Sequence, residues 1–396
     1  MRTAIIGGGA AGFFLAINLK ELCPEMEVTI LERSKRVLAK VEISGGGRCN
    51  CTNSFAEVRD LSAVYPRGHR LMKRLMKGFS HRDAYEWFER HGVRLTTQED
   101  QCVFPASQDS YAIINCFLNE ARRHGIEILT ETRVASCPRE FDFIAVTTGG
   151  SPKAEGLKWL ADLGHEIVQP VPSLFTFHID DALLQALMGT AVESATAYIP
   201  GTKLKACGPL LITHWGMSGP AILKLSSYGA RHLAENNYQQ PLAINWLSRS
   251  DEEIKQELLY LTTEGGKKQL SSMHPEGIPT RLWTYLTEKA LGLRAQSPWM
   301  SLNKKEINRL TNILANDTYK IAGRAPFKDE FVTCGGISLD AVNPTTLESR
   351  HVPHLYFAGE VLDIDGITGG FNFQAAWTTA YTVAQAITRT VKTTTI

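Results

Sequence analysis

Along the first 150 positions, the pattern of apolar and polar residues predicts strands that alternate with helices. A β-branched run at Thr3–Ile6 ends in glycines, Ala10–Leu22 has helical character, and Glu27–Leu31 is a second apolar run. A strand, a helix and a strand within about 30 residues have the length of a right-handed parallel crossover. The chain is therefore expected to begin with a parallel α/β unit.

The alternation continues to residue 150. Ser80 and Asp83 have the spacing of a capping box, which predicts a helix that runs through Glu89. The other elements expected here are two helices followed by two strands: Arg67–Phe79, Asp109–His124, Glu127–Thr130 and Phe141–Val146.

The pattern changes in the middle of the chain. Short alternating runs within Gln169–Trp246 predict an antiparallel or barrel-like sheet, and Ser248–Ala315 is mostly helical. From Phe331 the β character returns, with a buried strand at His354–Ala358 and a last helix at Ala375–Thr388. We therefore expect an α/β fold whose Rossmann-type nucleotide-binding domain is split by an inserted β-barrel-like and helical region. The expected boundaries are 1–165 and 329–396 for the split domain, and 166–328 for the insert, which would cover the cofactor and select the substrate.

Composition narrows the class of protein. The 396 residues carry 42 Lys+Arg against 41 Asp+Glu, a net charge of +1, which gives no support for a dedicated nucleic-acid binder. The eight cysteines include no CxxC pair, so we expect reduced thiols in a cytoplasmic protein and no metal site. No stretch reaches the roughly 20 apolar residues of a membrane span.

A glycine motif lies between the first strand and the first helix. Gly7, Gly9 and Gly12 form a G-x-G-x-x-G set around Ala10 and Ala11. Such glycines allow a tight turn, close approach of a pyrophosphate and close helix packing, and the helix N-terminus faces the phosphates. Glu32 ends the second strand 20 residues after Gly12, where a carboxylate accepts hydrogen bonds from a ribose. The motif in this context predicts dinucleotide binding.

Three more segments are rich in glycine and polar residues: Ser44–Asn50, Thr147–Gly150 and Gly366–Asn372. The last one precedes a helix, so the amides of Gly369, Gly370 and Phe371 are expected to face the N1–C2=O edge of a flavin, where charge accumulates on reduction. A nicotinamide would not need a second helix start near the end of the chain. This observation favours FAD over NAD.

Four separated blocks resemble one family. Gly45–Asn53, with the sequence GGGRCNCTN, is similar to the signature of the bacterial BaiN-like (YhiN-type) flavoproteins, which are called NAD(P)/FAD-dependent oxidoreductases. Three further blocks agree with that family: Thr213–Pro220, Thr333–Ile337 and Phe357–Gln374.

The resemblance implies a split FAD-binding domain and a set of cofactor contacts. By motif, Glu32 would hold the adenosine ribose, Glu360 would lie at the ribitol side, and Gly369, Gly370, Asn372 and Gln374 would lie by the isoalloxazine. The other residues expected at the cofactor are Arg33, Gly47, Arg48, Cys49, Asn50, Val134, Thr148, Gly149, Gly359, Asp363 and Phe371. The loop after Gly150 is shorter than in the family, so the substrate does not carry over.

Several residues have two interpretations. Cys49 is a redox thiol or, more commonly for such a residue, a small buried side chain. His214 and Trp215 line a substrate pocket or pack a barrel strand. Four cations on one face of the Arg67–Phe79 helix form a solvated surface or a contact with phosphate or RNA: Arg70, Lys73, Arg74 and Lys77. Asp363 and Asp365 fit flavin or turn contacts better than a metal.

The function expected is an FAD-dependent oxidoreductase that acts on a small organic substrate. No second G-x-G-x-x-G follows a strand, so NAD(P)H would visit the flavin only transiently. The alternatives are a flavoprotein that acts on RNA such as tRNA, and an amine-oxidising enzyme that uses O2.

Overall fold

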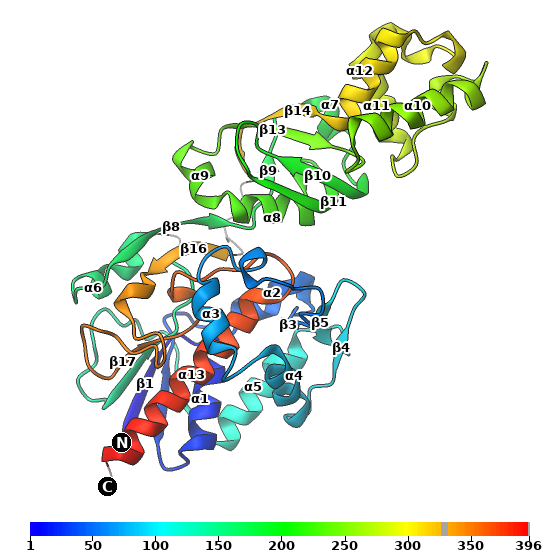
Figure 1. The fold of residues 1–396 in the computed structure, drawn as a ribbon. Helices are drawn as coiled ribbons and strands as arrows, with labels where there is room; N and C mark the ends of the chain where they lie inside the picture. Colours follow the sequence, from blue (N-terminus) through cyan, green and yellow to red (C-terminus); the bar gives the residue numbers. More distant parts are fainter. Residues whose placement is uncertain (152, 326–331, 395–396) are drawn as a thin grey trace. The chain divides into compact units, whose positions relative to one another are not determined.

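A computed structural model describes residues 1–151, 153–325 and 332–394. Contacts divide the chain into unit 1, Met1–Val171 with Val332–Ile396, and unit 2, Pro172–Phe331 (Figure 1). The division after Val171 lies six residues beyond the boundary expected after residue 165. The other expected boundary, 328/329, lies outside the described residues.

Unit 1 is built on a parallel sheet of five strands in the order β17-β7-β1-β2-β6. The register pairs Ile6 with both Leu31 and Val146, and Val146 with Phe357, so the strands end level with one another. The strands are β1 Arg2–Ile6, β2 Glu27–Leu31, β6 Glu127–Leu129, β7 Phe143–Val146 and β17 Leu355–Phe357. This sheet confirms the Rossmann-type α/β prediction.

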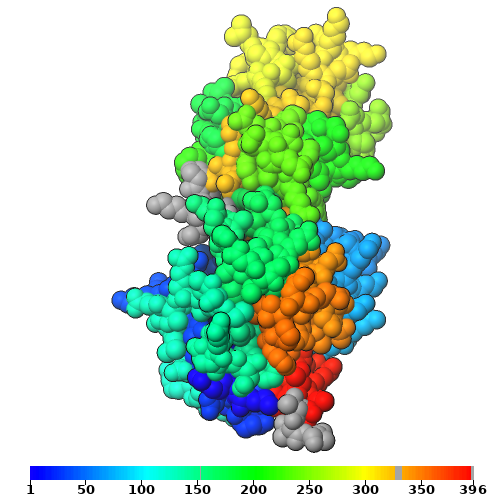
Figure 2. All heavy atoms as spheres, turned by 90° about the vertical axis from the view of Figure 1, so that its left-hand side faces the viewer, coloured from blue at the N-terminus to red at the C-terminus, as the bar shows by residue number. Residues whose placement is uncertain are grey.

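Helices from both ends of the chain pack together in unit 1. Helix α1, Ala10–Leu22, begins and ends where the sequence predicts, and it lies against α13, Phe371–Thr394. Phe14 contacts the rings of Trp87 and Trp377, which are fully buried. The first and last segments of the chain, blue and red in Figure 2, consequently share one body.

Local chemistry sets the other helix boundaries of unit 1. The capping box of Ser80 and Asp83 is present at the start of α4, His81–Arg90. Helix α3 covers only His69–Leu75, shorter than the predicted Arg67–Phe79, because Gly68 at φ +78° precedes it and a turn follows Leu75. Two further helices of this unit are α5 Tyr111–Arg123 and α6 Lys158–Ala161.

The three glycines Gly45–Gly47 of the glycine-rich, polar stretch lie at the end of a broken helix. Helix α2, Ala39–Gly47, is broken at Ser44–Gly46, and β3, Thr52–Asn53, follows it. β3 joins a small antiparallel sheet in the order β3-β5-β4, with β4 at Leu95–Thr97 and β5 at Cys102–Pro105. The three glycines, all at positive φ, lie after the regular helical part of this segment, Ala39–Ile43.

Unit 2 contains a seven-stranded antiparallel sheet in the order β14-β13-β10-β11-β12-β9-β15. The two ends of this order, β14 and β15, are separated in sequence only by Ala322, so the sheet must curl back on itself as a barrel-like structure. The strands are β9 Phe177–His178, β10 Ala191–Tyr198, β11 Lys205–Thr213, β12 Gly216–Ser218, β13 Gln240–Asn245, β14 Asp317–Ile321 and β15 Gly323–Arg324.

Helices complete the core of unit 2 around buried Trp246, Trp283 and Trp299. They are α7 Ala182–Gln185, α8 Pro220–Tyr228, α9 Ala230–Glu235, α10 Asp251–Gly265, α11 Thr280–Leu291 and α12 Lys304–Ala315. A further two-stranded sheet pairs β16, Val332–Ile337 of unit 1, with β8, Ile167–Ser173, of which only the last two residues belong to unit 2. Within the described ranges, no helix is both long enough and apolar enough to cross a bilayer.

Candidate cofactor site

The carboxyl ends of the parallel strands bring four segments of unit 1 to one edge. Gly7 follows β1, Glu32 follows β2, Thr147 follows β7, and Gly359 follows β17 after one residue. The amide of Gly7 donates to the carbonyl of Leu31 at 2.9 Å, and the Thr147 hydroxyl donates to the Gly7 carbonyl at 2.9 Å. Ligands of open α/β sheets bind at this edge.

The physical reason for a glycine differs among the three positions of the motif. A Cβ on Gly7, at φ +117°, would lie 2.5 Å from the carbonyl oxygen of Thr147, and a Cβ on Gly12 would lie 2.0 Å from the carbonyl oxygen of Gly7. Gly9 has φ −95°, and a Cβ there would meet no atom within 4 Å. The protein itself therefore requires Gly7 and Gly12, whereas the space beside Gly9 is left open, as a pyrophosphate would need.

The N-terminus of α1 presents backbone amides that no side chain caps. Its N-cap is Gly9, which offers no side chain to the first-turn amides. These amides, which include those of Ala10 and Ala11, have no partner within the helix, and the helix dipole adds positive charge beside them. The open space at Gly9 and these donors fit the diphosphate of a dinucleotide.

Glu32 is held in place by backbone amides. Its carboxylate accepts from the Gly8 amide at 2.8 Å and from the Ser34 amide at 2.7 Å. A carboxylate offers about four acceptor positions, so two of them are left for a ribose diol. Arg33 is exposed next to it, and Val134 lies half-buried in an irregular segment.

Glu360 has partners that the sequence did not reveal. One carboxylate oxygen accepts from the Thr333 amide at 2.7 Å, and the other lies 3.2 Å from the Lys40 ammonium. A Cβ on Gly150 would lie 2.6 Å from the Glu360 carboxylate, so glycine is needed there, while Gly149 has φ +71°. Lys40 stands outside the glycine motifs, so no sequence signal marked it.

The two other glycine-rich motifs, Gly45–Asn53 and Gly366–Asn372, lie together. The side-chain amide of Asn53 donates to the carbonyl of Gly369 at 3.0 Å. Asn372 closes the Gly366–Phe371 loop, since its side chain accepts from the Gly366 amide at 2.8 Å and donates to the Gly366 carbonyl at 3.0 Å. The buried Tyr65 hydroxyl donates to the carbonyl of Phe371 at 2.8 Å. Tyr65 was missed because a lone tyrosine carries no motif.

Two of the residues expected at the flavin, Gln374 and Gly370, have partners within the protein, and their contact with a flavin stays a prediction. Gln374 is fully buried, accepts from the Thr52 hydroxyl at 2.6 Å and donates to the Thr378 hydroxyl at 3.0 Å, because its helix face points into the core. A Cβ on Gly370 would lie 2.2 Å from the Thr52 carbonyl oxygen. Gly370 is therefore glycine because of protein packing, and with the Asn50 side chain oriented to satisfy its neighbours, the Gly370 amide donates to it at 3.2 Å.

Arg48 contacts neighbouring parts of the protein, and Cys49 is buried. The Arg48 guanidinium lies 4.3 Å from the ring centroid of Phe104, and Nε donates to the Gly45 carbonyl at 3.2 Å. Cys49 is fully buried at φ +60°, and burial raises the pKa of its thiol to about 12. Little thiolate forms at neutral pH, which favours the interpretation of Cys49 as a packing residue. Asp363 is half-buried, and its amide donates to the Ile337 carbonyl at 2.9 Å.

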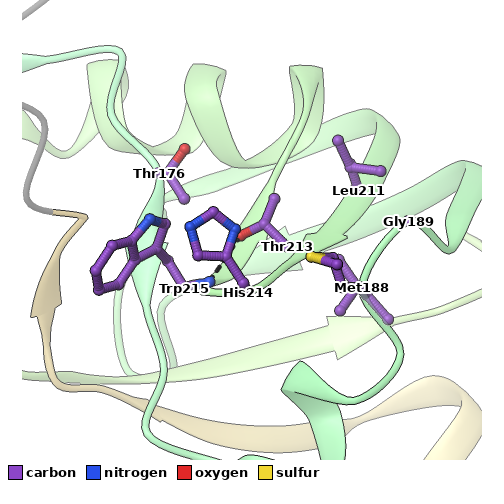
Figure 3. Close-up of a pocket in the computed structure, with 8 residues that line it drawn as sticks. Thr176, Met188, Gly189, Leu211, Thr213, His214 and Trp215 are labelled. Atoms are coloured by element: carbon purple, nitrogen blue, oxygen red, sulfur yellow. Dashed lines mark hydrogen bonds between the residues drawn. The ribbon is translucent and has the colours of Figure 1, made fainter.

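His214 belongs to unit 2, where it lines a small hollow of about 230 Å³ with Met188, Leu211 and Trp215 (Figure 3). The Trp215 amide donates to the Thr213 hydroxyl at 3.2 Å and fixes the turn between β11 and β12. The hollow is smaller than the roughly 300 Å³ at which ligand pockets begin. The expected roles of His214 in catalysis and of residues 166–328 in substrate selection stay predictions.

Comparison with known proteins assigns the family. The model of the HI0933-like protein Rossmann domain matches residues 1–386. The chain belongs to the HI0933-like family. The matched range extends over parts of unit 1 from both ends of the chain and over unit 2, and the resemblance carried by the four sequence blocks is confirmed.

Two relatives of this HI0933-like protein align along nearly their full length. The ribosomal RNA dihydrouridine synthase of Haemophilus influenzae is 27% identical over 97% of this chain and 98% of its own. The 3-dehydro-bile acid delta(4,6)-reductase of Clostridium scindens is 26% identical over 97% of this chain and 98% of its own.

A solved structure shares the fold. The 3-ketosteroid delta1-dehydrogenase of Sterolibacterium denitrificans superimposes with a TM-score of 0.51 at 9% identity, covering 98% of this chain and 99% of the other. Family, fold and relatives together place this protein among the FAD-dependent oxidoreductases.

Proposed function

We propose that this HI0933-like protein is an FAD-dependent reductase of carbon–carbon double bonds conjugated to a carbonyl group, with NAD(P)H as a transiently bound electron donor. The observation that carries the cofactor assignment is the open space beside Gly9 at the N-terminus of α1. The protein needs glycine for its own packing at Gly7 and Gly12 but not at Gly9, and the difference is explained by a ligand that approaches the backbone there.

The substrate class is supported by what two relatives have in common. A dihydrouridine synthase saturates a double bond of uracil that is conjugated to a ring carbonyl, and a delta(4,6)-reductase saturates double bonds of a bile-acid skeleton. When bound and reduced, a flavin supplies the hydride for such a bond, while a proton completes the saturation.

In this proposal, different residues of unit 1 would bind different parts of FAD. The first turn of α1 would hold the diphosphate, and Glu32 would hold the adenosine ribose. Glu360, fixed by the Thr333 amide and Lys40, would contact the ribitol side. The Gly366–Phe371 loop, fixed by Asn53 and Tyr65, would orient the isoalloxazine beside the N-terminus of α13.

An anaerobic assay tests the function. Protein loaded with FAD is reduced with NADH or NADPH, and then mixed with a conjugated enone or with uridine in free and RNA-linked form. The proposal expects flavin reoxidation together with a product two mass units heavier, with a conjugated acceptor and not with its saturated counterpart. Air is then admitted, and amines are tried as reductants in a parallel sample. A flavin that only O2 reoxidises, or that amines reduce and pyridine nucleotides do not, would refute the proposal and favour an amine oxidase.

A further inference from the structure

We propose that the exposed basic face of α3 and of the turn that follows it is a docking site for the phosphate backbone of an RNA substrate. We call it the α3 basic surface, and it consists of four side chains at helical spacing: Arg70, Lys73, Arg74 and Lys77. The proposal rests on the function proposed above, because it names the class of molecule that carries the conjugated bond.

The charges of this surface are free to meet a ligand. All four side chains are exposed, and none of them forms an ion pair with a residue of the described ranges. No Asp or Glu occurs between residues 61 and 82, and the preceding Asp60 accepts from the amide and hydroxyl of Ser62. Four cations within eight residues therefore stand out in a chain whose net charge is only +1.

The surface is rigidly connected to the loop that would orient the flavin. Arg67, just before α3, forms an ion pair with Asp365, and the side chains are 11% and 0% exposed. The Ile367 amide donates to the Val64 carbonyl at 2.9 Å, and a Cβ on Gly68 would lie 2.6 Å from Ile364. These contacts fix the start of α3 to the residues just before Gly369 and Gly370.

The opposite face of α3 supplies its packing contacts with the core. Leu71, Met72 and Leu75 are buried, and α3 packs against α13 (Figure 1). Replacing the exposed cations therefore leaves these three buried side chains in place. Guanidinium and ammonium groups that line an exposed helix are suited to successive phosphates, and such contacts hold a strand in register without reading its bases. A polyanion held there would place its bases at a constant distance from the flavin loop.

The test compares two variants of the FAD-loaded protein. The surface variant carries Arg70→Ala, Lys73→Ala, Arg74→Ala and Lys77→Ala. The matched control carries Lys267→Ala, Lys268→Ala, Lys304→Ala and Lys305→Ala, four exposed lysines of unit 2. Both lose four positive charges, so a net-charge effect is common to them. Affinity for a labelled single-stranded RNA of about 20 nucleotides is measured between 50 and 200 mM salt, because each phosphate contact to a single strand contributes about 0.7 to the salt slope.

The proposal expects the surface variant to lose at least about tenfold in RNA affinity and to show a salt slope lower by about 3, while the control keeps both values. FAD content should remain equal in the two proteins. Equal loss in both variants would overturn the docking site. Binding to anionic phosphatidylglycerol vesicles but not to RNA would overturn it in favour of a membrane surface.

Analysis of the reaction products distinguishes a failure of the docking-site proposal from a failure of the proposed function. Reduction of enones but never of uridine in bound RNA would overturn the inference and leave the proposed function intact. RNA binding through this surface without reduction of either acceptor would refute the proposed function and leave the docking surface supported.

Discussion

Arg67 and Asp365 form a nearly buried ion pair that joins the start of α3 to the glycine loop of the cofactor site. The two residues are 298 positions apart in the chain. Their pairing means that the loop Gly366–Phe371 is positioned by residues before α3 as well as by its own helix.

Removing this pair should loosen the loop. Arg67→Ala leaves the Asp365 carboxylate buried without its charge partner, which costs about 3–5 kcal/mol of folding free energy in comparable pairs. We expect a lower melting temperature and weaker FAD binding, measured by thermal unfolding and by flavin fluorescence. Arg36→Ala is the matched control, because Arg36 pairs with Glu42 at the surface and should be nearly neutral. A stable Arg67→Ala protein with normal FAD affinity would show that the ion pair is not needed to position the cofactor site.

Gly9→Ser should change stability and cofactor affinity in opposite directions. The new Cβ meets no protein atom within 4 Å, and serine is a favourable N-cap for α1. The apoprotein should therefore be as stable as the parent or about 0.5 kcal/mol more stable. The hydroxyl and Cβ would occupy the space of the diphosphate, so FAD binding should weaken by tenfold or more, on the order of 1.4 kcal/mol. Calorimetry of apoprotein and FAD titration give the two values, with Gly78→Ala as a glycine control away from the motif. Unchanged FAD affinity would show that the open space is not the cofactor's.

Glu32→Ala should discriminate between FAD and FMN. The carboxylate holds the amides of Gly8 and Ser34, so its loss lowers stability as well as ribose binding. Stability alone therefore does not test the ribose contact. FMN lacks the adenosine half, so the variant should bind FAD about 1–3 kcal/mol more weakly and FMN with nearly the parent affinity. Equal losses for the two flavins would assign Glu32 a structural role only.

Thiol labelling tests the buried environment of Cys49. Cys207 is exposed, and although burial raises the pKa of its thiol, hydrogen bonds with Ser248, Thr196 and Ser194 outweigh this and lower it, so Cys207 should react first. Cys49 should stay unlabelled until the protein unfolds, as mass spectrometry of digested samples can show. Early labelling of Cys49 in a Cys207→Ser protein would contradict its burial and support the interpretation of Cys49 as a redox thiol.

The same thiol predicts a dependence of stability on pH. The pKa of Cys49 is about 12 in the folded protein against an ordinary 9.0. Its contribution to stability is therefore complete below pH 9 and is lost as the pH rises toward 12, because only the unfolded chain ionises readily. Thermal unfolding between pH 7 and 10.5 should show a decline above pH 9 that is shallower in Cys49→Ala. Parallel curves for the two proteins would contradict the burial argument.

The sequence by itself determined the α/β start of the chain. Local features decide it: the β-branched run before Gly7, the helix that follows, and the 20-residue spacing from Gly12 to Glu32. The capping box of Ser80 and Asp83 could also be predicted from the sequence, because its two hydrogen bonds lie within four residues.

Only the tertiary structure decided which side chains face a ligand and which face the core. Gln374 and Gly370 belong to the same glycine-rich block as Gly369, yet their surroundings are set by Thr52, more than 300 residues away in sequence. Lys40 meets Glu360, and Arg67 meets Asp365, through contacts that no local pattern encodes. Periodicity and motif spacing report the geometry of one segment, whereas burial and ion pairing depend on distant segments that the parallel sheet and α13 bring to the same place.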